Sequence, residues 1–320
     1  MKNWLARLFG SPVQPAPTPP SAVPALTRVV NPPPSLDLDL AFYRSLAGGS
    51  AHAGEMPEGL ILDALARLAR QPEAAAELVP RVPAVIPQLL RSLRIDATSA
   101  GELARQVTQD VSLVAEVIRE ANSPYYRATA RIANIEGALM LLGQNGLRML
   151  LARVAFRPLI GSQGGRLARQ AAPQLWCQSE KCALAASMAA PACGADPFEA
   201  TLAGLMQNVG LVVALRLADQ LGGAAPLPQS DDFAHALLDS ARRLSAGIAG
   251  LWEFPPGVGQ AILQAGQLEA TPLARALHEG DRLSKLRVLC DAGSEQAIEL
   301  ATRLSEGELR MFDKLGSDHE

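Results

Sequence analysis

Residues 196–217 read DPFEATLAGLMQNVGLVVALRL, a stretch that is apolar almost throughout. Asp196 can cap the first turn of a helix, and Pro197 suits the first helical position because its missing N–H would have no partner there. After this start, the adjacent amides Gln207 and Asn208 are the main interruption of the apolar run. We therefore predict a helix from Phe198 to Leu217.

Similar sequence signals for the start and the end of a helix occur on both sides of this stretch. Asp110 can cap a segment with apolar residues on one face, and this segment ends at Asn122-Ser123-Pro124 because proline disfavours helical backbone in the residue before it. No run alternates apolar and polar residues as a half-buried strand would, and no repeat of fixed period occurs. The sequence thus predicts an all-α body with these further helices: Leu60–Arg70, Val85–Arg94, a helix opened by the capping box Ser99/Glu102, Ile135–Leu142 closed by Gly143, Leu147–Phe156 stopping before Pro158, Pro173–Ala190, Asp232–Leu251, Gly257–Ala265, Leu273–Leu289 opened by Thr271-Pro272, and two helices that start at Ser294 and Ser305.

The overall composition narrows the classes of function. The chain has 320 residues, and its 29 basic and 32 acidic side chains leave a net charge of −3. Nucleic-acid binding is not expected, because contacts to phosphate backbones need a basic excess. We expect no transmembrane segment, since no apolar run reaches about 18 residues without a polar interruption. The 4 cysteines contain no CxxC pair, which favours reduced thiols in a cytoplasmic protein.

The N-terminal residues differ in composition from the rest. Residues 1–10 form a short basic segment that either contacts a membrane surface or a partner's groove, or is a frayed terminus. Its bulky apolar side chains are Trp4, Leu5, Leu8 and Phe9. Residues 11–34 contain nine prolines, which predicts a disordered linker. Beyond it we expect an additional helical region over 35–79, a main helical domain over 80–290, and C-terminal helices and a tail over 291–320.

No familiar catalytic constellation is visible in the sequence. Gly161–Gly165 lacks the Lys-Ser/Thr pair of a phosphate-binding loop, and His278-Glu279 is not followed by the second histidine of a zinc-protease helix. The other histidines are scattered, and no Gly-x-Ser-x-Gly turn occurs. We therefore expect no metal ion and no cofactor.

A set of short segments follows an order that a known family shares. The segments are Val82–Pro87, Asp110–Leu113, Ala121–Tyr126, Ile132–Gly143, Leu175–Ser179, Gly204–Gly210 and Trp252–Pro255. In this order they resemble the HDOD domain, the HD-related output domain of bacterial signalling proteins. The resemblance implies a multi-helix, HD-like bundle. The shared residues that we interpret as structural are Asn122, Ser123, Gly143, Trp176, Gly204, Gly210 and Trp252.

The departures from the family pattern concern metal ligands. The resemblance implies a frame in which HD-type phosphohydrolases hold a divalent metal with a His, a His-Asp pair and a later Asp. Here Gln178 stands in place of one histidine, and Gln207 and Asn208 stand in place of the His-Asp pair. Amides supply neither carboxylate charge nor imidazole nitrogen, so we interpret these positions as vestigial. Hydrogen-bonded packing and a residual pocket for a small polar ligand both explain why they remain polar.

These observations lead to a hypothesis of a non-catalytic output or scaffold protein that binds other signalling proteins. Two alternatives remain open. A divergent metal-dependent phosphohydrolase would need His235 or His278 to converge with Asp231, Asp232 or Asp281. An inert sensor of a nucleotide or second messenger would need a pocket but no metal.

Overall fold

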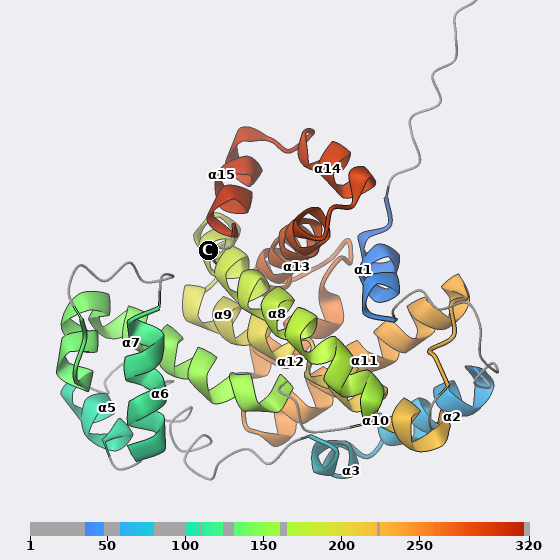
Figure 1. Ribbon diagram of the computed structural model, residues 1–320, viewed down its shortest axis with the longest axis horizontal. Coiled ribbons are helices and arrows are strands. Elements are labelled where there is room, and N and C mark those ends of the chain that lie inside the picture. The colour runs from blue at the N-terminus through green and yellow to red at the C-terminus, as the bar shows by residue number, and fades with distance from the viewer. Residues whose placement is uncertain are drawn as a thin grey trace, which may run out of the picture. The chain divides into compact units, whose positions relative to one another are not determined.

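The computed structural model describes residues 36–47, 58–79, 100–108, 111–123, 131–160, 165–222 and 225–316. The amphipathic segment and the linker predicted over 1–34 lie outside these residues, and so does the predicted helix Val85–Arg94. Within the described residues every regular element is an α-helix (Figure 1), which confirms the predicted fold class. The helices are α1 (Leu38–Ala47), α2 (Glu58–Leu68), α3 (Pro72–Glu77), α5 (Ala100–Val107), α6 (Val111–Ala121), α7 (Ile135–Ile160), α8 (Arg166–Cys193), α9 (Pro197–Met206), α10 (Val209–Gly222), α11 (Asp231–Leu251), α12 (Pro256–Gln264), α13 (Pro272–Asp291), α14 (Glu295–Ala301) and α15 (Glu306–Lys314).

Helices α8 and α13 pack against each other more extensively than any other pair among the described helices (Figure 1). Helix α9 covers another side of α8, and α10 packs on α11. Two glycines allow these close approaches, because a Cβ atom at Gly204 would lie 2.5 Å from Cα of Ala183 and one at Gly210 would lie 2.0 Å from the carbonyl oxygen of Ala241. At both positions the neighbouring helix lies too close for a side chain.

The helix predicted from Phe198 to Leu217 is wrong in one respect, because it is interrupted at its two amides. Helix α9 ends at Met206 and α10 begins at Val209. Ser245 of α11 satisfies backbone groups at the interruption: its Oγ donates to the carbonyl of Gln207 (2.6 Å) and accepts from the N–H of Gly210 (2.8 Å). A side chain from another helix thus replaces hydrogen bonds that a continuous helix would make itself.

The span from Pro197 to Gly222 is also the one described helical stretch long and apolar enough to cross a membrane by length and composition. However, 89% of its most apolar window is buried inside the fold. These helices therefore form part of the protein core, where apolar side chains are covered by neighbouring helices rather than by lipid.

Two predicted helix boundaries at prolines are also wrong. Helix α7 continues past Pro158, because the burial of Leu159 and Ile160 offsets the lost backbone hydrogen bond. Helix α8 begins before Pro173, because the carboxylate of Asp219 on α10 accepts hydrogen bonds from the first N–H groups of α8 at 2.9 and 3.2 Å. In both places tertiary contacts outweigh the local signal.

Several local signals are confirmed. Gly143 has a φ of 68°, the region that favours glycine, although the chain returns to helix at once, so that the two helices predicted on either side form the kinked α7. Thr271, Ser294 and Ser305 each accept a backbone hydrogen bond at a helix start. The sequence missed α1 and α3. Helix α1 packs against α8, α11 and α13, and its Phe42 is 1% exposed.

Candidate functional site

Two of the three vestigial positions meet in the interior. Gln178 lies on α8 and is fully buried, and Asn208 lies in the turn between α9 and α10. The Nδ2 group of Asn208 donates to Oε1 of Gln178 (2.5 Å) and to Oγ of Ser179 (2.9 Å). The buried Nε2 of Gln207 has no hydrogen-bond partner among the described residues, and the Gln207 side chain lies beside Cys182, which also neighbours Ser284.

Helix α13 completes this cluster. Nε2 of Gln178 donates to Oδ1 of Asp281 and to Oγ of Ser284, both at 2.9 Å. We call the five side chains Gln178, Ser179, Asn208, Asp281 and Ser284 the polar junction. They join α8, α13 and the α9–α10 turn, and none of them is more than 9% exposed. Hydrogen bonding within the junction satisfies polar groups that burial would otherwise penalise.

A lysine provides the positive charge beside the junction. Nζ of Lys285 lies 2.6 Å from Oδ2 of Asp281 and 2.5 Å from Oδ1 of Asp39, which comes from α1. Arg242 of α11 contacts the other oxygen of Asp39 at 2.7 Å. We call Asp39, Arg242, Asp281 and Lys285 the charge network. Its two carboxylates and two cations cancel, which is the arrangement that buried charges require.

The pKa directions follow from this geometry. Burial disfavours the charged form of Asp39, but the charges of Lys285 and Arg242 outweigh burial and hold the pKa of Asp39 well below its ordinary value. Burial likewise disfavours the ammonium of Lys285, yet Asp281 and Asp39 raise the pKa of Lys285 above its ordinary value. Both groups are therefore charged at neutral pH.

The residues present do not fit a divalent metal ion. The amide oxygen of Gln178 already accepts from Asn208, and both amides direct N–H donors, which cannot bind a cation, into the junction. The single carboxylate, Asp281, has its oxygens occupied by Gln178 and Lys285. Throughout the described ranges, no group of three His, Cys, Asp or Glu side chains is placed to hold a metal.

The relocated metal site considered from the sequence does not assemble in the structure. His235 of α11 lies 3.5 Å from a carboxylate oxygen of Asp37, while Asp231 pairs with Arg44 at 2.5 Å. Asp281 instead belongs to the charge network. Three of the proposed joint ligands, His235, Asp231 and Asp281, therefore face different partners.

Among the remaining family-motif residues, Asn122 links two segments by hydrogen bonds and two tryptophans are half-buried. Asn122 donates to the carbonyls of Ile118 (2.7 Å) and Ile132 (2.8 Å) and accepts from the N–H of Ile132 (2.8 Å), so it holds the chain before α7 against the end of α6. Ser123 Oγ has no partner among the described residues. Trp176 on α8 and Trp252 at the end of α11 are half-buried in the core. Trp4, Leu5, Leu8 and Phe9 lie outside the described residues.

Sequence reasoning missed most of the charge network. The four-residue spacing of Asp281 and Lys285 on one helix could have indicated that pair. Nothing local indicates Asp39, which lies 246 positions from Lys285. Arg242 sits among other charged residues on α11, so its buried partner was equally invisible.

The chain matches a known protein family over more than half of its length. The family model described as the HDOD domain matches residues 79–268, more than half of the chain. The chain belongs to the HDOD family. The match supports the resemblance drawn from the ordered motifs, and it excludes α1 to α3 at one end and α13 to α15 at the other. Part of the charge network therefore lies outside the matched HDOD residues.

Solved structures support the same fold. An HDOD domain protein of unknown function from Geobacter sulfurreducens is 23% identical, with a TM-score of 0.56, over 80% of this chain and 90% of its own. Two Shewanella amazonensis SB2B proteins also match. One, provisionally named a phosphohydrolase, is 20% identical, with a TM-score of 0.51 over 79% of this chain and 98% of its own. The other, provisionally named a metal-dependent phosphohydrolase, is 18% identical, with a TM-score of 0.53 over 79% and 96%. At these identities the likeness concerns the HDOD fold. No curated protein matches the sequence.

Proposed function

We propose that this HDOD protein is a non-catalytic signal-transduction protein that acts in the cytoplasm by binding other signalling proteins. The observation that carries the proposal is the polar junction together with Lys285. Where the family resemblance implies metal ligands, this chain has two hydrogen-bonded amides, and the nearby carboxylate of Asp281 is paired with an ammonium group 2.6 Å away.

The physical argument is a competition between cations. A divalent metal at Asp281 would have to displace Lys285, whose side chain is 8% exposed and would then lose one of its two carboxylate partners. An unpaired buried charge costs several kcal/mol. The amide oxygens that remain bring no negative charge to repay that cost or the metal's lost hydration. Water activation by a bound metal, the basis of HD-type hydrolysis, is therefore not supported by these residues.

Metal content and hydrolysis test the proposal directly. The full chain, purified without chelators, should contain far less than one equivalent of Mn, Fe, Zn or Mg by mass spectrometry. It should also hydrolyse neither nucleotides nor cyclic dinucleotides when Mn²⁺ is added. One equivalent of tightly held metal, with turnover that EDTA abolishes, would establish the phosphohydrolase alternative, which the names of the two Shewanella relatives suggest.

Partner binding tests the positive half of the proposal. Affinity capture with the full chain from cells of the source organism should recover specific signalling proteins that a control protein of similar size and charge does not recover. A thermal-shift screen with nucleotides separates the sensor alternative, because a ligand of the native state raises the apparent Tm by mass action. Specific capture without a nucleotide shift supports the scaffold, whereas a shift without capture contradicts it.

A further inference from the structure

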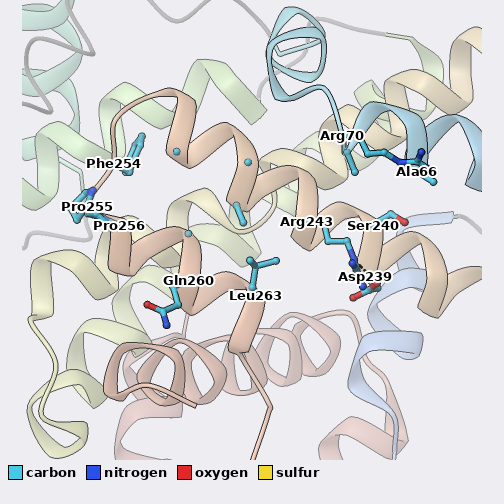
Figure 2. Close-up of a pocket in the computed structure, with 15 residues that line it drawn as sticks. Ala66, Arg70, Asp239, Ser240, Arg243, Phe254, Pro255, Pro256, Gln260 and Leu263 are labelled. Atoms are coloured by element: carbon cyan, nitrogen blue, oxygen red, sulfur yellow. Dashed lines mark hydrogen bonds and ion pairs between the residues drawn. The ribbon is translucent and has the colours of Figure 1, made fainter. Parts of the chain in front are cut away.

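A surface groove of about 940 Å³ lies away from the polar junction (Figure 2). Its walls come from the end of α2, one face of α11, and α12 with the turn that precedes it. The floor contains small residues, because Gly259 of α12 approaches α11 so closely that a Cβ there would lie 3.2 Å from the carbonyl oxygen of Ala246. Gly247 and Gly250 of α11 continue this floor.

The two ends of the groove differ in chemistry. Figure 2 shows Phe254, Pro255 and Pro256 together at one end, and Arg70, Asp239 and Arg243 at the other. Leu263 of α12, which lines one side, is 46% exposed, so its apolar surface is open to an occupant of the groove. The groove thus runs from an apolar end to a charged end.

Charge at the second end favours an acidic occupant. Arg243 pairs with Asp239 at 2.9 Å on the same helix. The guanidinium of Arg70 makes no hydrogen bond or ion pair within the described part of the chain. The side chains that line the groove therefore carry a net charge of +1. The guanidinium of Arg70 can donate two hydrogen bonds to the two oxygens of a carboxylate.

We propose that this groove binds an amphipathic, acidic helix of a partner protein. Bulky apolar side chains of the partner helix lie over Gly247, Gly250 and Leu263, and an Asp or Glu of the partner pairs with Arg70. The inference rests on the proposed function, because it names the docking surface through which the protein acts. Helices commonly bind in this way, with apolar residues at positions i, i+3 or i+4, and i+7 laid along a groove between helices.

The shape of the groove favours a peptide over a small molecule. Small-molecule sites are concave and enclose most of the ligand behind a few converging polar groups. Here the charged side chains stand at one end, and Gln260 and Leu263 of the outer wall are exposed. Small residues on the floor allow the backbone of an incoming helix to approach, and the open side leaves its polar face in solvent.

Peptide selection with the purified full chain tests this proposal. The probe is a phage-displayed library of random 12-residue peptides. Enriched peptides are then synthesised with fluorescein and measured by fluorescence anisotropy. We expect enriched sequences to combine Asp or Glu with bulky apolar residues three or four positions apart. We also expect R70E to weaken their binding about tenfold, and peptides with the acidic residue changed to Lys to recover binding to R70E.

A matched pair of glycine variants separates groove binding from effects on folding. A Cβ at Gly250 or at Gly307 of α15 would meet no atom within 4 Å, and both glycines are exposed on helices. G250L fills the groove and should weaken peptide binding at least tenfold, while G307L should leave it unchanged. If G250L unfolds, L263E at the exposed groove wall takes its place.

Several outcomes overturn the inference. They are enrichment of peptides without acidic residues, equal binding to wild type and G250L, or self-association of the full chain that G250L abolishes, which would make a second copy the occupant. If partners captured from cells bind wild type and G250L equally, the proposed function stands and the groove inference fails. If peptides select as expected but no partner is captured, the groove stands and the proposed function fails.

Discussion

Lys285 provides the positive charge beside the polar junction, and its position decides what the junction can bind. Its ammonium contacts carboxylates from its own helix and from α1, and with Arg242 as the second cation it balances the charges of Asp281 and Asp39. Neutral amides at Gln178 and Asn208 complete a site that needs no further cation. At the residue scale, these positions have changed from metal ligands, as the resemblance implies, to internal hydrogen-bond partners.

Removal of Lys285 should be costly. Lys285→Met leaves Asp281 buried without a cation and Asp39 with Arg242 alone, and we expect the free energy of unfolding to fall by about 3 kcal/mol. Denaturation in urea at pH 7 measures this change. The control is Arg243→Met, which breaks the exposed Arg243–Asp239 pair and should change stability by no more than about 0.5 kcal/mol. Equal effects of the two variants would contradict a structural role of the charge network.

The fall in the free energy of unfolding at acidic pH should depend on Asp39. Its folded-state pKa is depressed, so its contribution is present above the unfolded-state pKa of about 3.9 and is lost as pH falls toward the folded-state value. Asp39→Asn should therefore lower the free energy of unfolding at pH 7. Its deficit relative to wild type should shrink by about 1 kcal/mol between pH 5 and pH 3. Parallel stability curves over this range would show that Asp39 is not held ionised by Lys285 and Arg242.

Helix boundaries and helix contacts in this protein are settled by neighbouring elements. Ser245 of α11 interrupts the predicted helix between α9 and α10, and Asp219 of α10 starts α8 before Pro173. Gly210 lets α10 approach α11 at the place where Ser245 acts. The α9–α10 turn, which carries Asn208, is therefore positioned by α11.

Substitution of Gly210 tests this dependence. Gly210→Ala places a methyl group 2.0 Å from the carbonyl oxygen of Ala241. Because this oxygen belongs to the backbone, no rotation of a side chain can relieve the clash. We expect a loss of about 3 kcal/mol in thermal or urea denaturation. Gly307→Ala, where a Cβ meets nothing within 4 Å, should instead be neutral or stabilising by up to about 1 kcal/mol. A tolerated Gly210→Ala would mean that α10 and α11 can separate freely.

At the scale of the described body, one helical frame carries two distinct features. The polar junction is buried and the charge network is partly buried, with Asp39 and Arg242 partly exposed, and together they link α1, α8, α11 and α13. The groove is open and lies between α2, α11 and α12. Helix α11 contributes Arg242 to the network and Arg243 to the groove. The interior is thus arranged for stability, while the exposed face retains the properties of a binding surface.

Stability of the whole protein should be independent of divalent metals. If the charge network takes the place of a metal, neither EDTA nor millimolar Mn²⁺ should shift the apparent Tm of the full chain at pH 7. A metal that bound the native state at one hundred times its Kd would stabilise it by about 2.7 kcal/mol, which calorimetry resolves easily. A rise in Tm with Mn²⁺ that Lys285→Met increases further would reveal metal binding that Lys285 opposes.

Local signals were sufficient for the fold class and for many helix ends. Caps such as Ser305 and the turn at Asn122 act on backbone groups within a few residues, so their effect can be read from a short window of sequence. The ordered motifs likewise led to the HDOD family. The amides at Gln178 and Asn208, where the resemblance implies metal ligands, were also visible, because they concern the identity of residues and not their contacts.

Packing between distant segments settled the rest. Asp39 meets Lys285 across 246 positions, and the groove forms only where α2 lies against α11 beside α12. Burial and ion pairing depend on which surfaces come together in three dimensions. A short window of sequence does not show which distant segments meet. The amino-acid order thus specifies the helices and the family, whereas the pairing of Lys285 with Asp39 follows from the way the helices assemble.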